Sequence, residues 1–267
     1  MEIQPRSFGD ALGDLIKMLG KVWRPLLMPA LVGAAIVAAV SYFAFETSGS
    51  SEFFDLAFTD PEALEQMSEA EALELFRSFF AFFGLVAGLS SLIYGYLYLV
   101  AARAVGDAVA LTPSGRSLTV SALVLMLSWV VAMVLTIAGT LALSLLLILP
   151  GIWFGVTMSM VTPVLALEER GPLGAMRRSF ELVKGNWWET LGFLLLVGLI
   201  GGTAAQLTQF VAIPLFMSGN FSLAVGISIA LSVAVQGLII VAVAVAAAVW
   251  YLNLRARTDG PYVLEVT

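Results

Sequence analysis

The chain has 267 residues, of which 60% are hydrophobic and 12% charged, with a formal net charge of −6. A soluble domain typically carries about 25% charged residues, so this composition excludes an ordinary water-soluble fold and predicts a single membrane domain. Cysteine and histidine are absent, which excludes disulfides, thiol nucleophiles, histidine acid/base catalysis and the usual zinc, haem or copper ligand sets. We therefore expect no catalytic residues, no cofactor, no metal site and no enzyme activity.

The N-terminal region consists of a charged segment and then an apolar run. Residues 1–21 mix acidic and basic side chains, which predicts a cytoplasmic amphipathic segment rather than a cleavable signal peptide. Residues 22–45 are apolar except for Arg24. At 1.5 Å per residue they would reach about 36 Å, enough to cross the ~30 Å hydrocarbon layer. They are the first predicted span.

A strongly acidic loop follows at residues 46–77, which hold nine carboxylates. Asp60 can cap a helix whose first residue is Pro61. Its partial apolar stripe consists of Leu64, Met67, Leu73 and Phe76. We expect a short helix that lies against the membrane domain on the exoplasmic side.

Five further apolar runs complete the pattern, at residues 78–102, 118–149, 152–167, 187–216 and 221–254. The boundary between the third and fourth spans is predicted near Pro150, with Gly139 as another place to turn. The sequence thus predicts an all-α, polytopic membrane protein with six transmembrane helices in a membrane domain over 22–254. Residues 255–267 form a C-terminal tail.

Charge placement predicts the orientation of these spans. Every lysine and arginine except Arg77 falls on the side that holds both termini. The positive-inside rule makes that side the cytoplasm.

A second amphipathic helix is predicted at residues 172–185, before the fifth span. Pro172 suits its first turn and Gly185 its end. Its apolar positions are Leu173, Met176, Phe180 and Val183. Residues 8–27 align with residues 173–192, which pairs Gly20 with Gly185 and Trp23 with Trp188. Both segments read as a helix in the membrane interface, a glycine stop, an aromatic anchor and then a span.

Residues 148–192 resemble a group of bacterial and archaeal membrane proteins. The residues that carry the resemblance are Pro150, Gly151, Glu168, Gly171, Pro172, Ala175, Arg178, Ser179, Gly185 and Trp188. The group comprises the YciC-like proteins and the membrane domain of some glycerophosphoryl diester phosphodiesterases. The C-terminal YLNLRARTDG is similar to the group's ending, where aspartate is common at the position of Asn253. The resemblance implies a helical domain in a prokaryotic plasma membrane. Phosphodiesterase activity does not transfer, because the chain lacks the soluble catalytic domain and its histidines.

Three sets of residues are candidates for function. A site for lipid headgroups or phosphate is suggested by Arg177, Arg178, Lys184, Arg255 and Arg257, because guanidinium groups bind phosphate oxygens; ordinary positive-inside topology explains the same residues. A polar cavity is suggested by Gln206, Gln209 and Gln236, which hydrogen bonds between helices would also explain. Interface anchors are suggested by Trp23, Trp187 and Trp188.

Two hypotheses of function follow. The first is a non-enzymatic membrane protein whose partners are membrane lipids, anionic ones in particular, or another membrane protein or a second copy of the chain, but not nucleic acid. The second is a transporter or channel for a small or lipidic substrate. Ion-coupled transport is disfavoured because no charged residue lies near the centre of any predicted span.

Overall fold

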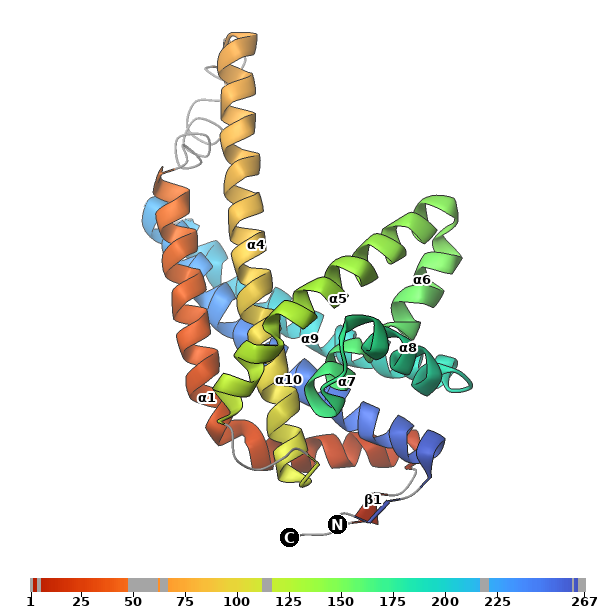
Figure 1. Ribbon diagram of the computed structural model, residues 1–267. Helices are drawn as coiled ribbons and strands as arrows, with labels where there is room; N and C mark the ends of the chain where they lie inside the picture. The colour runs from red at the N-terminus through yellow and green to blue at the C-terminus, as the bar shows by residue number, and fades with distance from the viewer. Residues whose placement is uncertain are drawn as a thin grey trace. The chain divides into compact units, whose positions relative to one another are not determined.

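The computed structural model describes residues 2–3, 6–47, 62, 67–111, 117–216, 221–260 and 262–263, and all structural statements below concern these residues. Most of them are helical (Figure 1). The helices are α1 (Phe8–Thr47), α4 (Glu69–Ala108), α5 (Leu118–Leu146), α6 (Ile148–Thr157), α7 (Val161–Glu168), α8 (Pro172–Val183), α9 (Trp187–Phe216) and α10 (Phe221–Asp259). Two short strands, β1 (Glu2–Ile3) and β2 (Tyr262–Val263), pair antiparallel near the two ends of the chain.

Within the described residues, 6 helical stretches are long and apolar enough to cross a membrane. They are Phe8–Phe45, Glu69–Ala108, Leu118–Leu146, Ile148–Glu168, Trp187–Leu207 and Leu231–Asp259. The fourth stretch consists of α6 and α7 together. The prediction of an all-α, polytopic membrane protein with six transmembrane helices is confirmed.

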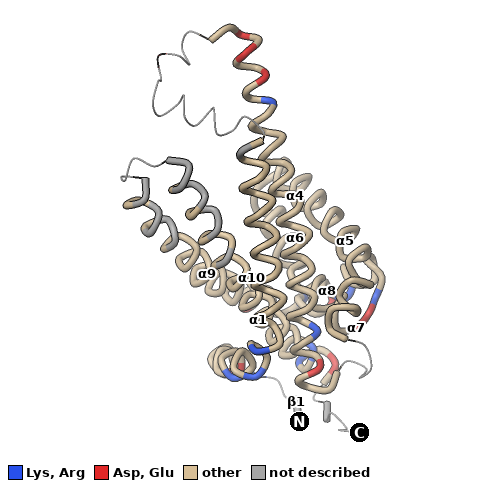
Figure 2. Tube along the Cα trace, turned by 90° about the vertical axis from the view of Figure 1, so that its left-hand side faces the viewer, with Lys and Arg blue, Asp and Glu red and all other residues tan. Residues whose placement is uncertain are grey.

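The chain forms two compact units. Unit 1 comprises Met1–Pro29, Gly95–Gly202 and Ile239–Thr267, and unit 2 comprises Ala30–Tyr94 and Thr203–Leu238. Helices α5 to α8 belong wholly to unit 1, whereas α1, α4, α9 and α10 contribute to both. Every described lysine and arginine except Arg77 lies in unit 1. Within unit 1, α5 and α6 carry no charge, and Figure 2 shows both in tan.

The turn between the third and fourth spans falls at Leu147, three residues before Pro150, near which it was predicted. Helix α5 ends at Leu146, and Leu147 has extended backbone angles (φ −159°, ψ 141°). Pro150 lies in the first turn of α6, where the missing amide hydrogen would have had no helical acceptor. Gly139, the other candidate, lies inside α5.

The predicted span over 152–167 is interrupted between Thr157 and Val161, where α6 ends and α7 begins. The buried side chain of Ser179 on α8 bridges this gap. Its hydroxyl donates to the Thr157 carbonyl oxygen (2.6 Å) and accepts from the Met160 amide (3.2 Å). Backbone groups inside lipid must be satisfied internally. Ser179 therefore makes this interruption compatible with a membrane interior.

The N-terminal amphipathic segment and the first span form one continuous helix, α1. Its first turn is capped by Ser7, whose hydroxyl accepts from the Asp10 amide at 3.2 Å. The predicted glycine stop at Gly20 was wrong, because α1 continues through it. Gly185 does end a helix, and its φ of +88° lies in the left-handed region that favours glycine.

The helix expected in the acidic loop falls mainly outside the described residues, and only the end of its predicted apolar stripe is described. Leu73 and Phe76 lie in the first turns of α4 and are exposed. The start of α4 is fixed by a capping box in which the Ser68 amide donates to Glu71 (3.0 Å) and the Glu71 amide to Ser68 Oγ (3.4 Å). Asp60, Pro61 and Leu64, which carried the prediction, lie outside the described residues.

Aromatic packing fixes the start of α1 within unit 1. The rings of Phe193 on α9 and Trp250 on α10 stack with their centroids 4.7 Å apart. Phe8 meets them edge-on at 6.3 and 6.0 Å. The indole of Trp250 also donates to Thr190 Oγ1 (3.1 Å). Three helices are thereby joined at one point.

In unit 2, Phe45 of α1 meets Phe82 of α4 edge-on with ring centroids 6.1 Å apart. Ala44 and Val86 complete this small cluster. It joins the C-terminal part of α1 to the N-terminal part of α4.

Helices α5 and α6 are antiparallel neighbours (Figure 1) that approach closely at glycines. A Cβ at Gly151 would lie 2.9 Å from Ser144 Cβ and 3.0 Å from Ser144 Cα, which is too close for either. At Gly155, on the same helix, the nearest atom would be Thr140 Cγ2 at 3.9 Å, an ordinary contact. Close approach through small residues is a standard way to pack membrane helices.

We predict opposite results for alanine at these two glycines. Gly151→Ala should lower the free energy of unfolding by about 1–3 kcal/mol, because α5 and α6 must separate. Gly155→Ala should be neutral or raise it by up to about 1 kcal/mol, because alanine favours helix. Thermal unfolding of both variants in one detergent tests this. Equal effects would contradict the close approach at Gly151.

Candidate functional site

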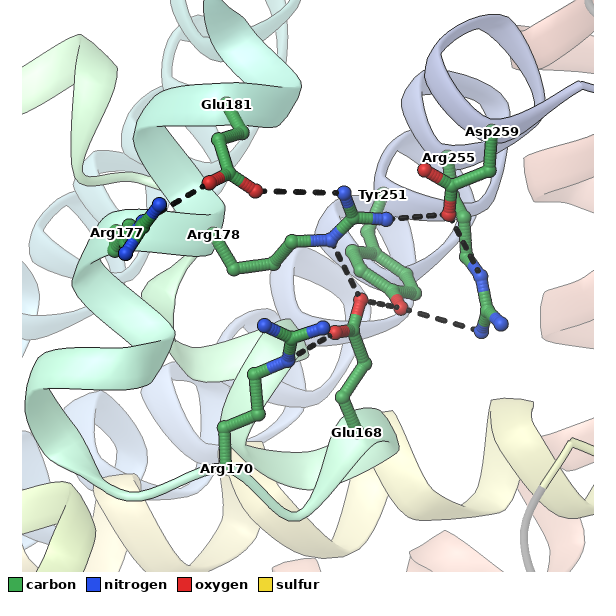
Figure 3. A network of polar contacts seen from close by, with 8 residues as sticks. All are labelled: Glu168, Arg170, Arg177, Arg178, Glu181, Tyr251, Arg255 and Asp259. Atoms are coloured by element: carbon green, nitrogen blue, oxygen red, sulfur yellow. Dashed lines mark hydrogen bonds and ion pairs between the residues drawn. The ribbon is translucent and has the colours of Figure 1, made fainter.

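Eight residues of unit 1 form a connected cluster of polar contacts where α7, α8 and α10 meet (Figure 3). Helix α7 ends at Glu168, and Glu169 follows with a left-handed backbone (φ 51°) that ends the helix. Pro172 then starts α8. The short connection brings the two ends of these helices together. The cluster consists of Glu168, Arg170, Arg177, Arg178, Glu181, Tyr251, Arg255 and Asp259.

Glu168 is the centre of this cluster. Its carboxylate accepts from Arg170 Nε at 2.6 Å, from Arg178 Nε at 3.1 Å and from the Tyr251 hydroxyl at 2.7 Å. The Glu168 side chain is only 10% exposed. Burying a carboxylate costs free energy unless donors satisfy its oxygens, and here three donors do so.

Arg178 is held by three carboxylates. Its side chain is 9% exposed and binds Glu168, Asp259 and, at 3.7 Å, Glu181. Burial lowers the pKa of Arg178, but the hydrogen bonds and charges of Asp259 and Glu168 raise it by more, so the net pKa is above its ordinary value. The guanidinium therefore remains charged. Arg178 was predicted to bind headgroups, but the structure places it inside the protein.

The two arginines of α10 that were predicted to bind headgroups, Arg255 and Arg257, also bind partners within unit 1. Arg255 lies 3.6 Å from Asp259 and 3.4 Å from the Tyr251 hydroxyl. Arg257 donates to Asn186 Oδ1 (2.9 Å) and to Glu189 Oε2 (2.6 Å). The contacts of Arg257 hold the end of α10 against the start of α9, whereas those of Arg255 lie within α10.

Arg257 and Asn253 also hold the N-terminal segment. Arg257 donates to the Arg6 carbonyl oxygen at 2.7 Å, and its guanidinium lies 5.7 Å from the ring centroid of Trp250. The Asn253 amide accepts from the Arg6 amide (2.8 Å) and donates to the Arg6 carbonyl (3.3 Å). An aspartate could accept the first bond but could not donate the second. The amide at position 253 therefore fits this contact.

The sequence did not point to Arg103 on α4 as a site residue, yet Arg103 is the ion-pair partner of Glu169. Its side chain is 4% exposed and donates to Glu169 Oε1 (2.6 Å) and to the Ala166 carbonyl (3.0 Å). The second bond satisfies an orphan carbonyl at the end of α7. The adjacent acids Glu168 and Glu169 thus bind different arginines. The sequence signal for this ion pair was a cation at the end of one predicted span together with an acidic pair at the end of another.

The outer side of α8 carries a different set of residues. Leu173, Arg177, Phe180 and Lys184 are all exposed and recur every three or four residues, so they form one stripe. The predicted apolar face is therefore split between two sides of the helix. Its residues were Leu173, Met176, Phe180 and Val183. The buried side consists of Ala175, Arg178, Ser179, Leu182 and Val183.

The predicted interface anchors lie in unit 1. Trp188 at the start of α9 is 78% exposed. Trp187 beside it donates to the Trp153 carbonyl at 3.2 Å. Trp23 on α1 is exposed, and the Arg24 guanidinium lies 5.7 Å from its ring centroid. Trp23 and Trp188 thus lie at the starts of the predicted first and fifth spans.

The predicted polar cavity concerns α9 and α10 in unit 2. Gln206 is exposed and Gln236 is half-buried, while the side chain of Gln209 lies outside the described residues. Within the described residues, no observation favours a transport path through these glutamines.

Comparison of the chain with protein-family models, with curated proteins and with solved structures finds no match. The class of protein, a polytopic helical membrane protein, therefore rests on the fold itself.

The two arginines beside the acidic pair should differ in their contribution to stability. Arg103→Gln should lower the free energy of unfolding by about 2 kcal/mol, because a buried charge-assisted bond and a helix cap are lost together. Arg170→Gln should cost less than about 1 kcal/mol, because Arg170 is half-exposed and Glu168 keeps two other donors. Thermal or denaturant unfolding in detergent measures both. A larger effect for Arg170→Gln would contradict this assignment.

Proposed function

We propose that this protein is a non-enzymatic, multi-pass membrane protein that binds membrane lipids through the outward stripe of α8, with anionic headgroups as its ligands. The observation that carries the proposal is the alternation of apolar and cationic side chains along this stripe: Leu173, Arg177, Phe180 and Lys184. Helices with this composition lie in the membrane interface, with apolar side chains toward the acyl boundary and cations at headgroup level.

The neighbouring residues support the proposal. Helix α8 leads through Gly185 into α9, a candidate span, and Trp188 stands exposed at that junction. Tryptophan is enriched at membrane interfaces. Arg177 is 85% exposed, and its pair with Glu181 (3.2 Å) is a surface pair of the kind that contributes little. The guanidinium is therefore available to a phosphate group.

The distribution of cations supports a cytoplasmic location of this stripe. Described lysines and arginines are confined to unit 1 apart from Arg77, as the positive-inside rule requires of the cytoplasmic side. The cytoplasmic leaflet carries anionic lipids, which attract each nearby lysine or arginine by about 1 kcal/mol. We assign both termini to the cytoplasm and the protein to a prokaryotic plasma membrane, in keeping with the YciC-like resemblance of residues 148–192.

The double variant Arg177→Gln/Lys184→Gln tests this function. Purified from a mixture of phosphatidylcholine and phosphatidylglycerol, it should retain several-fold less phosphatidylglycerol than the parent chain, since each cation contributes about 1 kcal/mol. Mass spectrometry of the co-purified lipids provides the measurement. Arg178 stays unchanged because it is paired inside unit 1.

The matched control is Arg177→Lys/Lys184→Arg, which keeps both charges and should keep the lipid ratio. An unchanged ratio in the glutamine variant would remove the headgroup site on α8. A loss in both variants would mean that geometry, and not charge, decides retention.

A further inference from the structure

The first half of α1 has an outer face that the packing of unit 1 leaves uncovered. The buried positions along this stretch are Ala11, Met18, Val22 and Leu26. On other sides of the helix, Ile16 is 72% exposed, Trp23 is exposed, and Lys17, Lys21 and Arg24 are exposed cations. An exposed isoleucine and tryptophan beside three cations need a partner that is both apolar and anionic.

The order of these residues around the helix matches the layers of a membrane surface. At about 100° per residue, Ile16 and Trp23 project within about 20° of each other. Lys17 and Arg24 lie about 80–100° from Ile16, and Asp10, Lys21 and Asp14 lie about 120–160° from it. The exposed surface thus passes from apolar residues to cations and then to a mixed group of one cation and two acids. A helix in the plane of a membrane meets acyl chains, headgroups and water in this order.

The glycines of this stretch leave the exposed face flat. Gly9, Gly13 and Gly20 lie between the line of Ile16 and Trp23 and that of Lys17 and Arg24, and a Cβ at any of them would have no atom within 4 Å. Glycine in a helix interior is less favourable than alanine by about 0.5–1 kcal/mol. Internal packing does not require these glycines, whereas a flat face lets a large surface approach the backbone.

Continuity with the first span places this face at the membrane. Helix α1 runs without interruption from Phe8 into the apolar stretch that ends at Phe45. The cation–π contact between Arg24 and Trp23 lies at the start of the predicted first span, residues 22–45. A helix that enters the bilayer at this point presents its preceding turns to the lipid interface.

We propose that residues 9–24 of α1 form a second lipid-contact site, in which Ile16 and Trp23 enter the interface of an anionic leaflet and Lys17, Lys21 and Arg24 bind its phosphate groups. This site uses no residue of the α8 stripe. The occupant is a phospholipid surface, because only that partner supplies the apolar and anionic layers in the observed order.

The absence of cysteine allows single-site labelling. Ile16→Cys and Asp10→Cys, each carrying an environment-sensitive fluorophore, are reconstituted separately into nanodiscs of phosphatidylcholine with phosphatidylglycerol. A headgroup-level nitroxide lipid should quench the label at position 16, and aqueous acrylamide should reach it poorly. The label at position 10, on the water side of the same helix, should show the reverse.

Adding Lys17→Gln and Lys21→Gln to the Ile16→Cys chain tests the role of charge. With nitroxide carried on an anionic lipid, quenching at position 16 should fall several-fold relative to quenching by nitroxide phosphatidylcholine. A label at Leu173→Cys, measured in parallel, reports on the α8 stripe separately, so that failure of one site is distinguishable from failure of the other.

Two outcomes would overturn the proposal. Acrylamide quenching at position 16 equal to that at position 10 would place Ile16 in water. Rapid disulfide-linked dimers of unlabelled Ile16→Cys, with the label shielded from both lipid and water, would assign the face to a second copy of the chain.

Discussion

The buried ion pair between Glu168 and Arg178 is the interaction on which the charged end of unit 1 depends. It joins the end of α7 to α8, and the Tyr251 hydroxyl, which donates to the same carboxylate oxygen, adds α10. Arg178 extends the link to Asp259. Removing one member of such a pair leaves an unpaired charge in a site from which water is largely excluded, which is strongly destabilising. The pair therefore fixes how three helices meet.

The adjacent Glu169 extends the same arrangement to α4 through Arg103. The internal use of these arginines separates two kinds of cation on this side of the protein. Arg103 and Arg178 are buried and act on helix ends, whereas Arg177, Lys184, Lys17 and Lys21 face outward. Only the second kind is available to headgroups. The ion pairs inside unit 1 and the proposed lipid contacts thus use different residues.

Hydropathy was sufficient to predict the six spans, because a membrane-spanning helix needs about twenty apolar residues and few other segments have them. It placed the turn between the third and fourth spans three residues too late, because Pro150 fits the first turn of a helix as well as a break. It also could not show the interruption between α6 and α7, because the hydroxyl that satisfies the free backbone groups comes from Ser179 on another helix. Such a contact depends on tertiary packing and leaves no local signal.

The misassigned face of α8 has a physical cause of the same kind. Leu173, Met176, Phe180 and Val183 were predicted to share one apolar face, but Leu173 and Phe180 are exposed whereas Val183 is buried. The small and polar residues Ala175, Arg178 and Ser179 pack inward instead. The buried hydroxyls of Thr190 and Thr162 follow this pattern, each accepting from a tryptophan indole. Helix packing in membranes uses small residues and side-chain hydrogen bonds in this way.

A double-mutant cycle on Glu168→Gln and Arg178→Gln, measured by unfolding in detergent, tests the central role of this ion pair most directly. We predict a coupling energy of about 2–3 kcal/mol, with the double variant more stable than the sum of the single changes implies. Additivity within about 0.5 kcal/mol would contradict it. In that case the two side chains would be neighbours without being the interaction that holds α7, α8 and α10 together.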